Sequence, residues 1–166
     1  MSKVQELDPI KKLNSLIKDI KIAMLTTVGE DGALLSRPMM TQDAEFDGTL
    51  WFFTSDDSPK AKEVGHTSRV NLTFSAPNEY RFVSVSGDAE VIHDKEKAKE
   101  FWKPAYHAWF PGGLEDPHLA LIRVTVHSAQ YWDSPSSKVK QLFGYAKAIL
   151  TGDKSGFGEN RKLALG

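Results

Sequence analysis

The sequence predicts a mainly β domain built as an antiparallel barrel, closed or partly split, with a helix at each end. Two observations carry this prediction. About six short segments rich in β-branched and aromatic residues follow one another along the chain. The links between them are too short for the crossovers of a parallel sheet. Closing such strands into a barrel removes exposed strand edges, so we expect a barrel.

The composition indicates one domain without a general attraction for charged partners. The chain has 166 residues, of which 40% are hydrophobic, which is enough for a single core. Lysine and arginine total 21 against 22 acidic residues, so we expect neither nucleic acid nor an anionic membrane as partner. The absence of cysteine excludes disulfides and thiolate chemistry. The start of the chain lacks the apolar core of a signal peptide, so we expect a cytoplasmic protein.

The predicted elements begin with an amphipathic helix. Asp8 and Pro9 have the pattern of an N-cap and a first helical residue, and apolar residues recur at helical spacing as far as Ile20. A strand, a tight turn and a second strand follow. The segments predicted as strands are 21–28, 33–41, 50–55, 69–75, 81–92, 119–128 and a short piece at 131–133.

The middle of the chain has one irregular position and one inserted helix. Gly87 lies inside the fifth predicted strand, where it indicates a β-bulge or a sharp bend. A charged helix is predicted to begin after Asp94 and to end by Pro104. A loop rich in aromatic residues, glycine and proline then spans 105–118.

The end of the chain is predicted to be a helix followed by a tail. Ser136 or Ser137 would cap the helix, and Gly152 would end it. We therefore divide the chain into a barrel domain at 1–152 and a C-terminal tail at 153–166. The tail carries glycines and mixed charge, so we expect it to pack poorly alone and to become ordered against a partner.

One strand-to-helix junction has the residues of a phosphate site. The strand ends in Thr54 and Ser55. A helix then begins with Ser58 as its N-cap, Pro59 at its first position and Lys60 after it. Unpaired N–H groups of a first helical turn, hydroxyl groups and an ammonium can together surround a phosphate. An ordinary capped surface helix with solvated lysines explains the same residues, and this alternative stays open.

Arg37 interrupts the otherwise apolar strand at 33–41, where a charge is costly unless it meets water or a partner. Its guanidinium could add a bidentate contact to the phosphate. Pro38 beside it cannot donate to a strand ladder, which indicates an edge or a bulge that a ligand could approach. An exposed arginine on the outer face of an edge strand fits the same pattern.

The aromatic and histidine residues give weaker signals. Trp109 and Phe110 are the better candidates for stacking on a planar ligand because they lie in a loop, whereas most tryptophans are core residues. The five histidines show no close metal-ligand spacing, so no metal site is expected. The glycine patterns of dinucleotide-binding folds, P-loops and nucleophile elbows are absent, and no catalytic acid or base stands out.

Several motifs occur together over almost the whole chain, from about Ile10 to Leu165. They are Ser-Arg-Pro-Met in the second strand, Phe-Thr-Ser-x-x-Ser-Pro-Lys at the strand-to-helix junction and Gly-Glu-Asn in the tail. In this combination the sequence resembles the general stress protein branch of the pyridoxamine-phosphate-oxidase-like split barrels. The resemblance implies a six-stranded antiparallel Greek-key split barrel of the FMN-binding type.

The resemblance also implies that FMN lies in a cleft between the two subunits of a homodimer. The residues implied at the phosphate and ribityl end are Arg37, Thr54, Ser55, Ser58 and Lys60. Those implied along the isoalloxazine are Pro38, Met39, Phe52 and Phe53. The residues implied to approach from the second subunit are Trp109 and Trp132.

The sequence departs from two relatives with known chemistry. The enzyme that makes pyridoxal phosphate carries two adjacent basic residues at its phosphate turn and an Arg-x-His signature near its C-terminus. Here Pro59 takes the first of those positions and no Arg-x-His follows Trp132, so we do not expect oxidation of pyridoxamine phosphate. Haem-degrading relatives rely on a C-terminal histidine, and none follows His127.

The leading hypothesis is therefore a redox-active, FMN-binding protein of the general stress type, with its substrate and electron donor unassigned. One alternative is a flavin store or sensor without a substrate. Another is a protein that binds a related ligand, such as the deazaflavin F420, in the same cleft. A further alternative is a barrel that acts as an interaction module and whose cleft binds no flavin.

Overall fold

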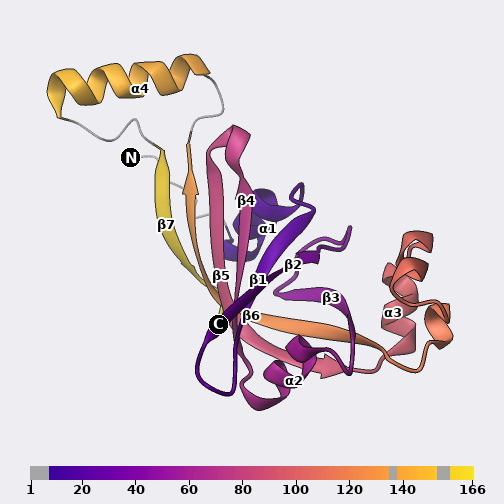
Figure 1. Ribbon diagram of the computed structural model, residues 1–166. Coiled ribbons are helices and arrows are strands. Elements are labelled where there is room, and N and C mark those ends of the chain that lie inside the picture. The colour runs from indigo at the N-terminus through magenta and orange to yellow at the C-terminus, as the bar shows by residue number, and fades with distance from the viewer. Residues whose placement is uncertain (1–7, 135–137, 153–157) are drawn as a thin grey trace.

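The computed structural model describes residues 8–134, 138–152 and 158–166, which form an antiparallel sheet curled into a half-barrel with flanking helices (Figure 1). The strands are β1 (Ile22–Val28), β2 (Leu34–Met40), β3 (Thr49–Ser55), β4 (Arg69–Ala76), β5 (Arg81–Ile92), β6 (Leu119–Asp133) and β7 (Glu159–Ala164). The helices are α1 (Pro9–Ile17), α2 (Pro59–His66), α3 (Lys95–Phe101) and α4 (Lys138–Thr151), with short 3-10 turns at Pro77–Glu79, Pro104–Ala108 and Gly113–Glu115. In the described ranges no helix has the length and apolar character needed to cross a membrane.

The strand order leaves the barrel split on one side. The hydrogen-bonded order is β2-β1-β4-β5-β6-β3, and every pairing is antiparallel. Within the described residues β2 pairs only with β1, and β3 pairs only with β6. The mainly β split-barrel fold is thus confirmed, and Pro38 lies on an edge strand as its missing N–H predicts.

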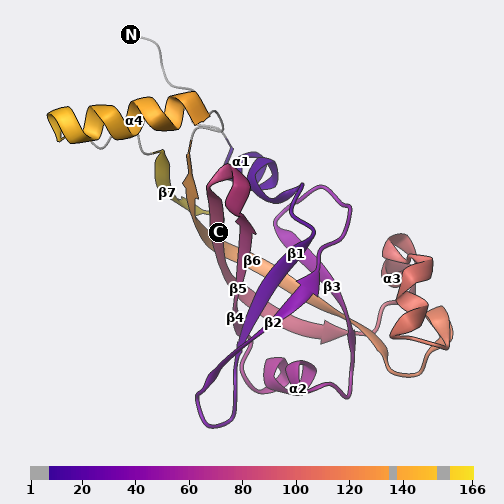
Figure 2. The ribbon, with the colours of Figure 1, turned by 45° about the horizontal axis from the view of Figure 1, so that its top comes forward.

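The core lies on the inner face of the curled sheet. Alternate residues of the central strands point inward, and Leu25, Leu72 and Val83 are almost completely buried. Helix α1 packs on this face through Leu13 and other apolar residues of one side. Burying a side chain of this size contributes about 1.5–3 kcal/mol to stability. Helices α3 and α4 lie at opposite ends of the sheet (Figure 2).

The predicted helix starts agree with the structure. Asp8 caps α1 by accepting the N–H of Ile10 at 3.0 Å. Ser58 and Asp94 cap α2 and α3 in the same way, through the N–H groups three residues further on. Helix α2 continues through Gly65 to His66, one residue beyond its predicted end. The predicted caps Ser136 and Ser137 lie outside the described residues.

The irregular position at Gly87 is a β-bulge, as predicted. The register between β5 and β6 shifts between Ser86 and Gly87. A Cβ atom at Gly87 would overlap the carbonyl oxygen of Thr125 on β6, so only glycine fits without a shift of the strands. Strand β6 itself runs without interruption through 119–133, where the sequence predicted two separate segments.

The tail contributes a seventh strand that the sequence analysis missed. Residues Glu159–Ala164 pair with Ser128–Asp133 of the same chain, and Leu163 and Leu165 pack against the core. The expectation that the tail packs poorly alone is therefore wrong for residues 158–166. Packing of the tail on a second copy stays a prediction.

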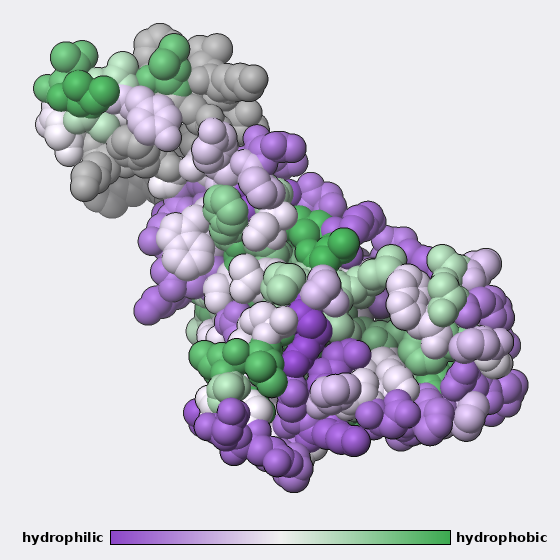
Figure 3. All heavy atoms as spheres, in the orientation of Figure 1, coloured by the Kyte–Doolittle hydropathy of each residue, from purple (hydrophilic) through white to green (hydrophobic). Residues whose placement is uncertain are grey.

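Helix α4 projects from the end of the sheet with an apolar surface toward solvent. Leu142 is 70% exposed, and Ile149 and Leu150 are each 83% exposed. Figure 3 shows hydrophobic side chains on the surface of the projecting helix. The helix ends before Gly152, which has a φ of +70° and fits the predicted stop.

Candidate functional site

A cavity of about 550 Å³ lies at the split between the edge strands β2 and β3, beside the N-terminus of α2. Its volume is within the roughly 300–1,000 Å³ of small-molecule sites. The lining residues are Ile22, Pro38, Met39, Met40, Gln42, Phe53, Thr54, Ser55, Lys60, Tyr106, Trp109 and Phe110. The cavity thus combines an apolar, aromatic wall with one cation.

The polar end of the cavity is built by the turn from β3 into α2. The N–H of Ser58 donates to the carbonyl of Ser55 at 3.1 Å, which closes the turn. The hydroxyl groups of Thr54 and Ser58 hydrogen-bond at 3.1 Å, and Thr54 is only 2% exposed. Ser58 also accepts the N–H of Ala61 at 3.3 Å, so the hydroxyl that caps the helix lies next to the cavity wall.

Lys60 is the cation that lines the cavity. Its side chain is half-buried, and burial is the main reason that its pKa lies below the usual 10.5. The positive charge of Arg37 lowers this pKa further, while the carboxylate of Glu63 opposes the shift. A dissolved anion that enters the cavity would therefore meet a poorly solvated positive charge.

Arg37 is held away from the cavity by partners within the barrel. Its Nη2 donates to Glu63 at 2.8 Å, and its Nη1 donates to the buried hydroxyl of Thr27 at 2.5 Å. The hydroxyl of Thr27 in turn donates to Glu63 at 2.5 Å. These contacts hold the pKa of Glu63 below its usual value, with the Thr27 hydrogen bond as the largest cause. Arg37 therefore acts on the cavity through its charge beside Lys60.

The aromatic wall comes from β3 and from the segment after α3. The ring of Phe53 lies 4.6 Å from that of Tyr106 and 6.4 Å from that of Phe110, centre to centre. The hydroxyl of Tyr106 donates to Gln42 at 3.1 Å and so ties this segment to the end of β2. Trp109 borders the cavity but is 64% exposed.

The structure brings most, but not all, of the predicted site residues together. Those that line the cavity are Pro38, Met39, Phe53, Thr54, Ser55, Lys60 and Trp109. Ser58 does not line the cavity but hydrogen-bonds to Thr54, which does. Arg37 does not line it either, and its charge acts on Lys60. Phe52 points to the opposite side of β3, where it is 1% exposed in the core and borders a second cavity of about 380 Å³.

Trp132 does not line this cavity within the chain. Ser55 pairs with Leu119 at the start of β6, whereas Trp132 lies near the other end of the same strand. Trp132 is 41% exposed and pairs with Phe82 of β5 on the outer face of the sheet.

Sequence reasoning missed four lining residues, namely Ile22, Met40, Gln42 and Tyr106. The first three lie on or beside the strands that form the cavity. Only the fold shows which residues of these segments face the cavity. Tyr106 belongs to the aromatic loop from which Trp109 and Phe110 were selected, so its signal was present but shared with many neighbours.

Known proteins similar to this chain agree with the fold. The protein bli-3 of Neurospora crassa is 29% identical over 165 residues, which cover 93% of this chain and 79% of that protein. A structure named as a candidate general stress protein 26 from Jannaschia sp. CCS1 has 28% identity and a TM-score of 0.76, and covers 93% of this chain and 97% of its own. The general stress FMN/FAD binding protein of Xanthomonas citri has 35% identity and a TM-score of 0.65, and covers 78% and 90%.

The family match covers both the strands and the cavity described above. The family described as pyridoxamine 5'-phosphate oxidase like matches residues 8–156, which include all the lining residues and every strand except β7. The chain therefore belongs to the pyridoxamine 5'-phosphate oxidase-like family.

Proposed function

We propose that this protein binds FMN in the cavity between β2 and β3 and uses it in redox reactions, as a flavoprotein of the general stress type. The observation that carries the proposal is the position of Lys60, a half-buried cation at one end of a cavity whose other walls are apolar and aromatic. FMN has the matching shape, because its flat ring system carries a ribityl chain that ends in a phosphate. The Xanthomonas citri relative, which is named as an FMN/FAD binding protein, supports the choice of a flavin.

The phosphate would be held by Lys60 and by the start of α2. A helix N-terminus carries unpaired N–H groups and a partial positive charge, both of which favour an anion. The hydroxyl groups of Thr54 and Ser58 lie along the same turn and would add contacts to the phosphate and the ribityl chain, and Ser55 would join them by turning its hydroxyl from Asp57. Arg37 would add positive charge while it keeps its ion pair with Glu63.

The ring system would lie against the aromatic wall. Phe53 and Phe110 offer apolar faces, while the backbone at Pro38 and Met39 borders the cavity on an edge strand. The exposed Trp109 would close the outer side when the ring is bound. These contacts would exclude water from the part of the flavin that accepts and donates electrons.

Bound FMN supplies hydride and electron transfer, so the chain has to bind, orient and shield it. The titratable side chains among the residues that line the cavity are Lys60 and Tyr106. Neither is placed as a general base for a second substrate, which favours reactions that need only hydride exchange. Steady oxidation of NADH or NADPH by the FMN-loaded protein would support an oxidoreductase. Its absence with every nicotinamide and acceptor tried would favour the flavin store or sensor.

We further propose that the active form is a homodimer that forms through the outer face of the sheet. This face carries exposed apolar side chains on adjacent strands, namely Ile22, Met24, Pro38, Met40, Phe82 and Trp132. Exposed apolar surface of this kind marks interaction sites in soluble proteins. Trp132, which does not line the cavity of its own chain, would reach the flavin of the second copy.

The direct test is a flavin titration of the purified protein. Saturable quenching of flavin fluorescence, at one FMN for each chain, is the expected result. Riboflavin should bind more weakly because it lacks the phosphate, and deazaflavin F420 should be titrated beside it to compare the two ring systems. No binding at micromolar FMN would contradict the proposal and favour the interaction module.

A further inference from the structure

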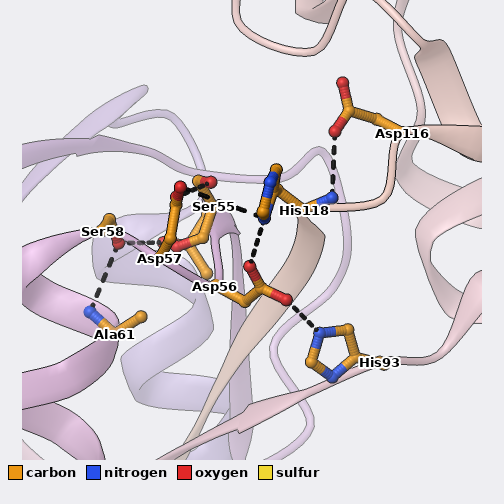
Figure 4. Close-up of polar contacts among 9 residues, drawn as sticks. Ser55, Asp56, Asp57, Ser58, Ala61, His93, Asp116 and His118 are labelled. Carbon is orange, nitrogen blue, oxygen red and sulfur yellow. Dashed lines mark hydrogen bonds and ion pairs between the residues drawn. The ribbon is translucent and has the colours of Figure 1, made fainter.

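Asp56, Asp57 and His118 cluster on the surface beside the junction of β3 and α2, and His93 contacts Asp56 from another side (Figure 4). Asp56 and Asp57 belong to the junction itself, His93 follows β5, and His118 precedes β6. The two oxygens of Asp56 lie 2.9 Å from Nε2 of His93 and 2.9 Å from Nδ1 of His118. An oxygen of Asp57 lies 3.9 Å from the same atom of His118.

We propose that Asp56, Asp57 and His118 form a binding site for one divalent transition-metal ion of the zinc type, with water completing the coordination and His93 holding the other oxygen of Asp56. Imidazole nitrogens and carboxylate oxygens are ligands that Zn²⁺ prefers in proteins without cysteine. Bonds of about 2.0–2.2 Å to a tetrahedral ion set neighbouring ligand atoms roughly 3.3–3.6 Å apart. The distances from Nδ1 of His118 to Asp56, 2.9 Å, and to Asp57, 3.9 Å, therefore need only small adjustments.

Hydrogen bonds hold three of these residues in position before any ion arrives. The N–H of Asp56 donates to the carbonyl of His118 at 2.9 Å, which ties the junction to the start of β6. The N–H of His118 donates to Asp116 at 3.0 Å, and the hydroxyl of Ser55 donates to Asp57 at 2.5 Å. Supporting hydrogen bonds of this kind orient metal ligands and raise affinity.

The site joins elements that are distant in the sequence. His93 and His118 are separated by α3 and the aromatic segment, and both meet the turn that begins α2. A bound ion would therefore fix this turn against the start of β6, while His93 ties it to the end of β5. The ion would have a structural role at the back of the cavity wall, and the inference does not depend on which ligand the cavity binds.

The test is a Zn²⁺ titration of the full, tag-free chain after treatment with a chelator, followed by isothermal titration calorimetry. We expect one saturable equivalent with micromolar affinity. His118→Gln should weaken binding at least tenfold, His93→Gln should weaken it less because His93 only holds the other oxygen of Asp56, and the double variant should abolish it. Co²⁺ in place of Zn²⁺ should give the visible absorption of a four-coordinate ion in the wild type and lose it in the double variant.

His127→Gln is the matched control, because His127 also contacts an aspartate, Asp88, at 2.5 Å, but the cation-binding cluster does not include this pair. It should bind Zn²⁺ like the wild type. Asp57→Asn changes an exposed side chain with little effect on folding and should weaken binding. The proposal is overturned if the wild type shows no saturable binding, if the double variant binds normally, or if His127→Gln weakens binding as much as His118→Gln.

Discussion

At the scale of the residue, Lys60 carries most of the proposed phosphate site. We expect Lys60→Ala to weaken FMN binding roughly tenfold to a hundredfold, because a hydrogen bond to a charged group contributes about 1.5–3 kcal/mol. The measurement is the dissociation constant from flavin fluorescence. Lys62→Ala is the matched control, since Lys62 lies on the same helix but is exposed and does not line the cavity. Equal effects of the two variants would contradict the site.

The pKa of Lys60 gives this site a pH dependence. Burial and Arg37 lower the pKa in the free protein, whereas a bound phosphate would raise it. Above the lowered pKa of Lys60, the free protein has lost a proton that the complex still holds. The affinity for FMN should therefore fall as the pH rises through this pKa, which lies below 10.5. Dissociation constants measured from pH 7 upward test this.

Two comparisons isolate the proton on Lys60 in that experiment. Riboflavin, which has no phosphate, should not show the same fall in affinity. Lys60→Arg should remove most of the dependence, because a guanidinium stays charged over the whole range. A wild-type affinity for FMN that stays constant through pH 10.5 would mean that Lys60 does not meet the phosphate.

The candidate site was partly predictable from individual residues. Ser58 and Pro59 are local signals, and they fixed the start of the helix that holds Lys60. The partner of Arg37 was not predictable, because Glu63 and Thr27 meet it only after two strands and a helix have packed. For the same reason, spacing along the chain gave no indication that His93 and His118 share Asp56.

At the scale of the element, the bulge in β5 predicts how a larger side chain at Gly87 changes the stability of the fold. Gly87→Ala should destabilise the fold by about 1–3 kcal/mol, since the new methyl group would overlap the carbonyl of Thr125. Gly65→Ala should instead stabilise it by roughly 0.5–1 kcal/mol, because Gly65 lies within α2 and a Cβ there meets only open space. Urea unfolding of both variants tests the pair. A Gly87→Ala protein as stable as the wild type would show that the strands adjust freely.

The strands with clear flanking turns were predictable, and the others were not. Gly29 and its neighbours mark the turn between β1 and β2 regardless of the rest of the fold. In contrast, β7 is a strand only because β6 offers it a free edge, and its own burial is low. Strand β6 was split in the prediction because exposed polar residues near Ser128 interrupt its apolar pattern, although its pairing with β5 continues.

At the scale of the whole molecule, the apolar outer face of the sheet predicts how a charged substitution there changes the oligomeric state. Phe82→Glu should convert the proposed dimer into a monomer, because a buried unpaired charge in an interface is strongly unfavourable. Sedimentation velocity would measure the change, and FMN affinity should fall with it if the second copy completes the site. Lys11→Glu is the control, since it changes an exposed residue of α1, which packs on the opposite, inner face. A variant at Phe82 that stays dimeric would contradict this interface.

The pairing of β3 with β6 has a consequence for the order in which the molecule is assembled. It joins Ser55 to Leu119, which lie 64 positions apart in the sequence, whereas β4 and β5 meet through one short turn. Loop closure over such a separation is entropically costly and slow compared with local hairpins. During synthesis, the hairpins can form early, but the cavity wall has to wait until the ribosome has released the residues of β6. A flavin could then bind only after the cavity is complete. It would stabilise the folded chain without guiding the earlier steps of folding.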